Sequence, residues 1–432
     1  MSVFSRGTAS RSRVRAALGG IAIAGVSVLV LAGCTSGGGG EASEPTESAG
    51  PVEDLALTIG TALPQTGNLA FLGPPEEAGV AYAQSQINAA TADTGLELEV
   101  VFGDSGNTDN KAYETEIPRL LGEGVSAIIG AASSSTSLQF IDQVVGAGVI
   151  QFSPANTSDA FTTYDDNGLY FRTAPSDVLQ GEVLGNLIAE DGNQTLGMIV
   201  LNDSYGTGLA KYVTEAFEAA GGEVVAAPTY NTGDTSFDAQ ISEVLAAAPD
   251  AIALITFDEV VTILPSLIGQ FPADKFYFVD GNLKNFEPGQ FPEGSLTGSK
   301  GTLPGLTIDT LGEFTDELDA FLEEEGTPAL TDYSYAAESY DATILLALGA
   351  LAAGSTEGEA IAGKLQEVSG GSGDGEKCET YADCAAIIVG GGTADYDGIS
   401  GPITFDEVGD PTEASIGIYE YQDDNTYVAY EG

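Results

Sequence analysis

The sequence lacks histidine and tryptophan altogether, and its 432 residues include only 13 lysines and arginines against 65 acidic residues. Histidine is the commonest general base, the commonest zinc ligand and the central member of a Ser-His-Asp triad, so its absence disfavours most hydrolases and zinc enzymes. A formal net charge of −52 argues against a nucleic-acid partner, because phosphate binding depends on clustered lysine and arginine. We therefore expect no enzyme, no metal site and no cofactor.

The acidic residues are spread along the chain and form no acidic tail. This distribution is typical of a solvated, self-repelling surface that keeps a protein soluble and monomeric. We expect a monomer.

Long apolar runs are scarce. One such run, 18–32, lies near the N-terminus. Four arginines precede it, and no acidic residue occurs before Glu41. A positive segment, an apolar segment and small residues before a cut site are typical of a secretory signal. No later run reaches the ~18–20 residues that a membrane span needs. The longest, 342–353, predicts a buried helix.

The apolar run ends in Leu31-Ala32-Gly33-Cys34. This sequence resembles the bacterial lipoprotein signal, in which Cys34 becomes the lipid-modified first residue. The resemblance implies a signal peptide over 1–33 and a protein tethered to the outer face of the cell membrane. A signal peptide followed by an incidental cysteine is the alternative. Residues 34–54 are rich in Gly, Ser, Glu, Thr and Pro, which predicts a flexible tether.

Only three cysteines occur in the chain. With Cys34 lipidated, Cys378 and Cys384 remain as a pair in an exported protein, which favours a local disulfide. Two free thiols are the alternative.

Short β-rich runs alternate with helical stretches from residue 55 onward. The strand runs are apolar almost throughout, as parallel sheets buried on both faces require. The expected strands are 55–62, 96–103, 125–130, 149–153, 195–201, 223–227, 251–256 and 276–279. The expected helices are 75–90, 111–122, 135–145, 205–220, 237–247 and 260–268.

The alternation breaks near 170–175 and near 301–304. We interpret the breaks as crossings between two similar lobes, each an α/β parallel doubly wound sheet, joined by a hinge. The predicted first lobe is 55–173 plus 304–400, and the second is 174–303 plus 401–432. Helices after 311 would return to the first lobe. Strand-like pieces at 402–405, 416–421 and 426–429 would finish the second.

Three motifs suggest other chemistry. The segment 103–106 reads Gly-Asp-Ser-Gly, as in trypsin-like proteases, but a triad needs a histidine base. The glycines of 206–208 form only part of a dinucleotide-binding fingerprint. The acidic segment 406–410 suggests calcium, but it lacks the spacing of an EF-hand loop and predicts a polar turn.

Ligands of open α/β sheets bind beyond the carboxyl ends of the strands. The residues at these ends are hydroxyls, amides, aromatics and two isolated carboxylates. A serine run starting a helix can hold an anion with backbone N–H groups and no cation, although plain capping explains Ser134 equally well. Each candidate also has an interpretation without a ligand. Tyr205 could be a packed aromatic, Thr157 a turn residue, and the two carboxylates solvated helix caps. The candidates are Ser134, Ser135, Ala155, Asn156, Thr157, Tyr205, Phe257, Asp258, Asp280 and Asn282.

The order of these motifs resembles the periplasmic leucine/isoleucine/valine-type binding proteins, of the type I periplasmic-binding fold, from about residue 55 to 421. The matching segments are 59–67 (Ile-Gly-Thr-Ala-Leu-Pro-Gln-Thr-Gly), the serine-run helix through 153–157 (Ser-Pro-Ala-Asn-Thr), 202–206 (Asn-Asp-Ser-Tyr-Gly), 335–342 (Tyr-Ala-Ala-Glu-Ser-Tyr-Asp-Ala) and 401–406 (Gly-Pro-Ile-Thr-Phe-Asp).

The resemblance implies that Ser134 and Thr157, with the backbone at Ala155, bind a ligand carboxylate, and that Tyr205 packs over the ligand. In the family an acidic residue of the second lobe holds the ligand ammonium. Asn282 stands at the aligned position, two residues after Asp280, and Phe257-Asp258 replaces an aromatic pair. Either Asp280 or Asp258 takes the ammonium, or the ligand has none.

The resemblance further implies a lipid-anchored substrate-binding protein that delivers a small polar solute to the permease subunits of an ABC importer. The solute is an amino acid, an amide or urea-like compound, or a small organic acid. A ligand sensor on the same fold is the alternative, and an extracellular hydrolase is disfavoured by the missing histidine.

Overall fold

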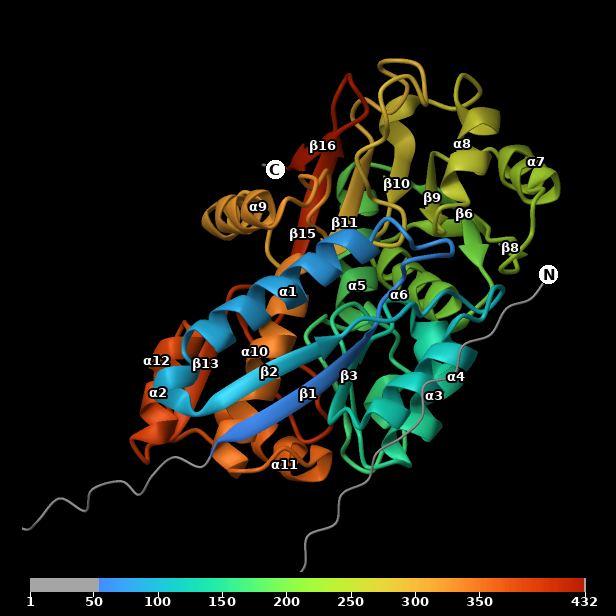
Figure 1. The fold of residues 1–432 in the computed structure, drawn as a ribbon. Coiled ribbons are helices and arrows are strands. Elements are labelled where there is room, and N and C mark those ends of the chain that lie inside the picture. The colour runs from blue at the N-terminus through green and yellow to red at the C-terminus, as the bar shows by residue number, and fades with distance from the viewer. Residues whose placement is uncertain (1–53, 431–432) are drawn as a thin grey trace, which may run out of the picture. The chain divides into compact units, whose positions relative to one another are not determined.

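The computed structural model describes residues 54–430, so the predicted signal, Cys34 and most of the predicted tether lie outside the described residues. Two large sheets organise the chain (Figure 1). The first has five parallel strands in the order β2-β1-β3-β4-β5. Its strands are β1 (Leu55–Ala62), β2 (Leu96–Val101), β3 (Ala127–Gly130), β4 (Ile150–Ser153) and β5 (Tyr170–Arg172).

The second sheet has eight strands, in the order β16-β15-β11-β10-β9-β6-β7, with β8 also pairing with β6. The strands from β11 to β7 run parallel, whereas β15 is antiparallel to both β11 and β16. Its strands are β6 (Thr195–Leu201), β7 (Glu223–Ala226), β8 (Thr229–Tyr230), β9 (Ala251–Ile255), β10 (Phe276–Phe278), β11 (Lys300–Pro304), β15 (Ile416–Tyr421) and β16 (Tyr427–Ala429).

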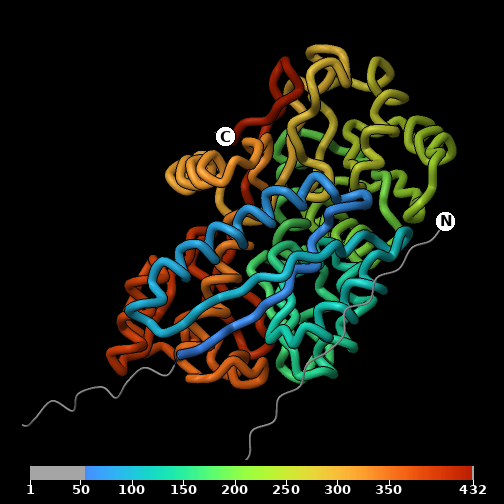
Figure 2. The backbone as a smooth tube through the Cα atoms, viewed as in Figure 1, coloured from blue at the N-terminus to red at the C-terminus, as the bar shows by residue number. Residues whose placement is uncertain are grey.

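Helices cover both sheets. The apolar cluster of the first sheet includes residues from helices that precede β5 and from others that follow β11, and Figure 2 shows how the late chain returns beside the early chain. These helices are α1 (Gly73–Ala89), α2 (Thr91–Thr94), α3 (Tyr113–Glu123), α4 (Ser134–Val145), α9 (Gly312–Glu325), α10 (Ala336–Ala353), α11 (Gly358–Val368) and α12 (Tyr381–Val389). Those of the second sheet are α5 (Asp177–Glu190), α6 (Ser204–Ala219), α7 (Asp238–Ala247) and α8 (Val260–Leu267). Two short 3₁₀ turns are η1 (Phe161–Thr163) and η2 (Ala273–Lys275).

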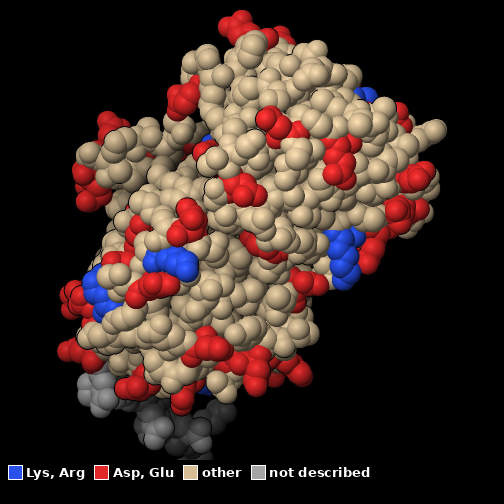
Figure 3. Space-filling view, turned by 90° about the vertical axis from the view of Figure 1, so that its right-hand side faces the viewer, with Lys and Arg blue, Asp and Glu red and all other residues tan. Residues whose placement is uncertain are grey.

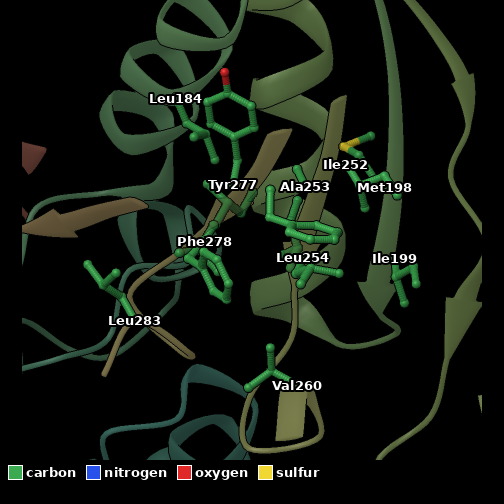
Figure 4. Close-up of a cluster of buried hydrophobic side chains, with 14 of the residues drawn as sticks. Leu184, Met198, Ile199, Ile252, Ala253, Leu254, Val260, Tyr277, Phe278 and Leu283 are labelled. Atoms are coloured by element: carbon green, nitrogen blue, oxygen red, sulfur yellow. The ribbon is translucent and has the colours of Figure 1, made fainter. Parts of the chain in front are cut away.

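The core of the second sheet shows why the strand runs are so apolar. All five residues of β9 and all three of β10 are buried, because helices lie on both faces of the sheet. Figure 4 shows Ile252, Ala253 and Leu254 packed among Met198, Phe278 and Leu184. The sequence expectation of doubly covered parallel sheets is confirmed for these strands.

Helix α10 is the one described helix that is long and apolar enough to cross a membrane by length and composition, but 83% of it is buried inside the protein. It packs against α1 and α11, so its apolar surface is covered on several sides. The sequence prediction of a buried helix is confirmed.

The expected placement of 402–405 in the second lobe is wrong. Gly401–Pro402 forms β14, which pairs with β13 (Ala394–Gly398) in a third sheet that also contains β12 (Glu376–Cys378). The reason is burial of Phe405, whose ring packs edge-on against Phe152 and Phe171 beside the first sheet. Strand β12 and helix α12 are joined by the Cys378–Cys384 disulfide, as the sequence predicted, with the Cα atoms 5.4 Å apart.

The chain passes between the two large sheets after β5, after β11 and between β14 and β15. That these passages act as a hinge between two lobes stays a prediction. Figure 3 shows acidic side chains scattered over the visible face with few basic ones among them, as the spread of acid along the sequence predicts.

Candidate functional site

One wall of the candidate site is the start of α4. Strand β3 ends at Gly130, and Ser133 caps the helix, its hydroxyl accepting from the Thr136 N–H. Because Ser133 is the cap, Ser134 is free for another contact. Its side chain is buried, its Oγ accepts from the Ser158 N–H at 3.2 Å, and it lines a small cavity.

Thr157 lies beside Ser134 on the same wall. It follows β4 and is only 1% exposed, yet its hydroxyl has no hydrogen-bond partner among the described residues. A buried polar group without a partner costs about 1–3 kcal/mol, and such groups in a native structure call for an explanation. A ligand in the cavity that Thr157 lines would supply the missing partner.

The opposite wall is built around Asp280, which follows β10. Its carboxylate accepts hydrogen bonds from the Tyr205 hydroxyl at 2.6 Å, the Gln180 amide at 3.0 Å and the Tyr335 hydroxyl at 2.9 Å. Burial nevertheless raises the pKa of Asp280, and the three donors only partly oppose the rise. Burial and the nearby Asp280 charge raise the pKa values of Tyr205 and Tyr335 well above 10.0, so both phenols stay protonated as donors.

A second carboxylate, Asp177, adjoins this wall. It is the first residue of α5, it is fully buried, and neither of its oxygens has a hydrogen-bond partner in the described chain. Burial first and the Asp280 charge second raise its pKa well above the ordinary value. The Thr157 hydroxyl is near enough to lower that pKa, but not in hydrogen-bond geometry. Because the two buried carboxylates lie close together, they favour the binding of a cation between them or the sharing of protons.

The two walls enclose a very small cavity, in which about 10 Å³ is accessible to a water-sized sphere. Its polar residues are those described above, and its remaining surface is apolar or aromatic. Tyr205 and Phe257 stack with their ring centroids 5.1 Å apart. The lining residues are Leu69, Leu72, Ala132, Ser133, Ser134, Ala155, Thr157, Tyr205, Phe257, Asp280, Gly281 and Tyr335.

The structure therefore brings together six of the ten residues predicted from the sequence, namely Ser134, Ala155, Thr157, Tyr205, Phe257 and Asp280. The other four do not line the cavity. Ser135 bonds to the Ser133 hydroxyl. Asp258 is half exposed at its side chain and pairs with Lys284, and both residues line a larger open groove instead.

The side chains of Asn156 and Asn282 are fully buried and form hydrogen bonds with backbone groups. The Asn156 amide donates to the carbonyls of Ala131 and Ala132. The Asn282 amide donates to the Leu254 carbonyl and the Thr256 hydroxyl. Their hydrogen bonds shape the loops around the cavity and leave little capacity for a ligand.

Sequence reasoning missed Leu69, Leu72, Asp177, Gln180 and Tyr335. Tyr335 could have been found, because it is the first residue of the 335–342 motif. The motif does not, however, predict that Tyr335 adopts φ 62° immediately before α10. Among residues 54–430, no group of three or more cysteines, aspartates or glutamates is placed to hold a metal ion.

Two helix-covered sheets with a small cavity at their strand ends are an arrangement in which open α/β folds bind small molecules. A family model described as periplasmic binding protein matches residues 56–377. The chain therefore belongs to the periplasmic binding protein family, and its likeness to solved structures shows the type I fold of such proteins. The sequence-based resemblance and fold class are confirmed.

Individual relatives agree. The chain is 26% identical over 371 residues to a leucine-, isoleucine-, valine-, threonine- and alanine-binding protein of Pseudomonas aeruginosa, covering 86% of this chain and 91% of that protein. It is 23% identical over 358 residues to BasB, a substrate-binding protein of a chemotactic signal transduction system in Halobacterium salinarum, covering 80% of this chain and 83% of BasB.

Solved structures show the same fold. The leucine-binding protein LivK of Thermotoga maritima matches with a TM-score of 0.67 at 20% identity, covering 87% of this chain and 98% of that one. The branched-chain amino acid substrate-binding protein LivJ of Streptococcus pneumoniae, in complex with isoleucine, matches with a TM-score of 0.66 at 22% identity, covering 87% and 100%.

Proposed function

We propose that this chain is the lipid-anchored, extracytoplasmic substrate-binding protein of an ABC importer, and that its ligand is an α-amino acid. The observation that carries the ligand class is the arrangement of the cavity. An unpartnered, buried threonine hydroxyl and a helix start lie on one side, and the buried carboxylate of Asp280 lies on the other. A second buried carboxylate, Asp177, lies near both sides.

The ligand carboxylate faces the start of α4 and the Thr157 hydroxyl. Backbone N–H groups at a helix start hold an anion without a lysine or arginine, which suits a chain that has only 13 basic residues. The hydroxyl of Thr157 then gains an ionised acceptor, and hydrogen bonds to charged groups contribute about 1.5–3 kcal/mol.

The ligand ammonium faces Asp280, with Asp177 beside it. A neutral amide or urea-like ligand would leave two buried acids without a cation, and a simple organic acid would add a third negative charge to them. An ammonium instead favours ionised carboxylates, in opposition to the burial that raises their pKa values. The α-amino acid is therefore preferred among the three solute classes that the sequence leaves open.

The ligand side chain packs among Leu69, Leu72 and the stacked pair Tyr205–Phe257. These surfaces favour an apolar side chain, and the Pseudomonas and Thermotoga relatives are both named for binding leucine among their ligands. A ligand that contacts both walls at once stabilises the closed form over an open one, which is the basis of hinge closure in such proteins.

A thermal-shift screen tests the ligand class. The panel contains the L-amino acids, their amides, urea-like compounds and small organic acids. A ligand at ~100 times its dissociation constant stabilises the folded state by ~2.7 kcal/mol. We expect shifts only for free α-amino acids, and largest for those with apolar side chains. A shift for amides or organic acids alone would contradict the assignment.

The anchor is tested separately. We expect intact-mass analysis of membrane-extracted protein to show a diacylglyceryl-type addition on a chain that begins at Cys34. An unmodified Cys34 would contradict lipid anchoring and leave the ligand proposal untouched.

Sensing is a second candidate function, favoured by the similarity to BasB of Halobacterium salinarum. The two candidates share a ligand and differ in partner. Loss of amino acid uptake in a deletion strain with normal chemotaxis supports transport, and the opposite pattern supports sensing.

A further inference from the structure

A buried arginine forms hydrogen bonds with the backbone of the loop that carries Thr157. Arg172, in β5, is 0% exposed. Its Nη1 donates to the Ser158 carbonyl at 2.8 Å and to the Asn156 carbonyl at 3.3 Å. The Thr157 carbonyl between them accepts from the Asp177 N–H at 2.6 Å. Three successive carbonyls are thus held, while the Thr157 hydroxyl is left free and lines the cavity.

Arg172 is itself held by Asp410. The pair is bidentate, with Nε to Oδ1 at 2.6 Å and Nη2 to Oδ2 at 2.7 Å. Asp410 ends the acidic segment 406–410 that the sequence singled out. Within it, the Asp406 carboxylate accepts from the N–H groups of Val408 and Asp410 and closes a turn. The segment is therefore a turn that presents Asp410 to β5.

The backbone of the turn is anchored to the same strand. The Arg172 N–H donates to the Gly409 carbonyl at 3.1 Å. Gly409 has φ +80°, and a Cβ there would lie 2.4 Å from the Tyr170 carbonyl oxygen. Only glycine fits this close approach, so the chain between β14 and β15 is fastened directly behind the ligand-binding loop.

We propose that Arg172 and Asp410 are positioning residues that set the affinity for the ligand without touching it. The ion pair fixes the carbonyls of Asn156 and Ser158, and thereby aims the Thr157 hydroxyl into the cavity. Arg172 is suited to this task because its planar guanidinium can bind a carboxylate in bidentate fashion and still donate to backbone carbonyls. The proposal rests on the proposed function of the cavity.

Single substitutions do not test this proposal, because removing one partner leaves an unpaired buried charge and destabilises the fold. The decisive variant replaces both partners by apolar residues, Arg172→Met with Asp410→Leu, since replacing a buried ion pair in this way is often neutral for stability. The matched control is Arg119→Met with Glu116→Leu, which removes the ion pair on α3 and leaves the Thr157 loop unchanged.

Three quantities are measured on each variant: the melting temperature, the dissociation constants over the L-amino acid panel by calorimetry, and amide hydrogen exchange at Ser158 and Asp177 in ligand-free protein. For the Arg172/Asp410 double variant we expect a folded protein with a lowered melting temperature, because the carbonyls of Asn156 and Ser158 lose a donor. We also expect at least tenfold weaker binding and at least tenfold faster exchange at Ser158. The α3 control should match the parent in binding and in exchange.

Parental binding and parental exchange in a folded double variant would overturn the proposal and leave the pair a purely structural contact. A double variant that unfolds is replaced by Arg172→Lys, which keeps the charge but cannot reach both carbonyls and Asp410 together, with the same expectations. If the proposed function is wrong, the binding results differ from these: Thr157→Val and Asp280→Asn bind like the parent, or no amino acid binds at all. Hydrogen exchange at Ser158 would still test whether Arg172 and Asp410 position the loop.

Discussion

The two walls of the cavity differ in the chemistry that they offer a ligand. The wall at the start of α4 presents hydroxyls and backbone N–H groups and carries no ionisable side chain. The opposite wall presents Asp280 among phenols, and a second buried acid, Asp177, lies near both Asp280 and Thr157. This asymmetry matches a molecule with a negative end and a positive end. A site for a neutral solute would need neither buried acid.

In the proposed binding mode, a chain with few basic residues binds a carboxylate without using them. Helix starts carry a partial positive charge from their unpaired N–H groups, so no arginine is needed on the first wall. In the same proposal the second wall binds the ligand ammonium through the Asp280 carboxylate, which the ammonium favours in its ionised form.

The largest effect is expected at the acidic wall. Asp280→Asn removes the charge that faces the ammonium, and we expect amino acid affinity to fall at least ~100-fold, corresponding to the upper range for a charged hydrogen bond. Asp258→Asn is the matched control, because Asp258 follows the neighbouring strand but pairs with Lys284 away from the cavity. Calorimetry on both variants measures the difference. Equal losses, or none in either, would contradict the assignment of Asp280.

The next effect is expected at the hydroxyl wall. Thr157→Val should weaken binding roughly tenfold to a hundredfold while leaving the melting temperature of the ligand-free protein unchanged or slightly raised. Thr136→Val is the control, because Thr136 has a second buried threonine hydroxyl without a partner, but it does not line the cavity. Only Thr157→Val should change the dissociation constant, and a binding loss shared by both variants would point to a general packing effect.

The acidic wall also predicts a pH dependence of binding. Burial raises the pKa values of Asp280 and Asp177 in the ligand-free protein, and a bound ammonium favours their ionised forms. Binding should therefore release protons, and affinity should rise with pH until the free pair is ionised. Calorimetry in two buffers of different ionisation enthalpy measures the release. Proton uptake on binding would contradict a cationic ligand group.

A buried acid away from both walls sets a pH dependence of stability. Burial raises the pKa of Glu338 from 4.5 to about 8. Between these values the folded protein binds more protons than the unfolded chain, so rising pH favours unfolding by up to about 1.4 kcal/mol per pH unit from this group. Glu338→Gln should flatten the fall in melting temperature from pH 5 to 8. Glu324→Gln, an exposed change on α9, should leave the slope unchanged.

The smallest effect is expected from the Cys378–Cys384 disulfide. The bridge spans a sequence separation of 6, and so short a loop should contribute less than the typical ~2–4 kcal/mol. Reduction should loosen β12 and α12, seen as faster hydrogen exchange there, and leave ligand affinity within twofold. A large loss of affinity on reduction would link this region to the cavity in a way that the contacts do not explain.

The sequence predicted the sheets well because buried parallel strands need continuous apolar runs, and β9 and β10 have them. It also placed Ser134 and Thr157 at one cavity, because the rule that ligands lie beyond strand ends depends only on chain order; their contact with a ligand stays a prediction. It did not place 402–405, since Phe405 packs against side chains more than two hundred residues away in the sequence.

The acids show where sequence reasoning ends. Asp258 and Asp280 both follow buried strands, and spacing alone gives them equal claims. In the structure Phe257 takes the place at the cavity and Asp258 pairs with Lys284, whereas Asp280 receives three donors from distant elements. Asp177 was missed because the chain around it suggests only a crossing between lobes. Its place near Asp280 depends on the packing of α5 against β11 and β15.

The most direct test of the account compares three matched ligands by calorimetry. The first is the amino acid that binds most tightly in the panel. The second is the amine that lacks its carboxylate, and the third is the α-keto acid, in which a carbonyl replaces the amine. Each end of the ligand should contribute independently, one to each wall. We expect both analogues to bind at least ~30-fold more weakly than the amino acid, from the loss of charged hydrogen bonds, and Asp280→Asn to narrow the gap between the amino acid and the keto acid. A keto acid that binds the parent as tightly as the amino acid would contradict the central claim that the acidic wall holds an ammonium.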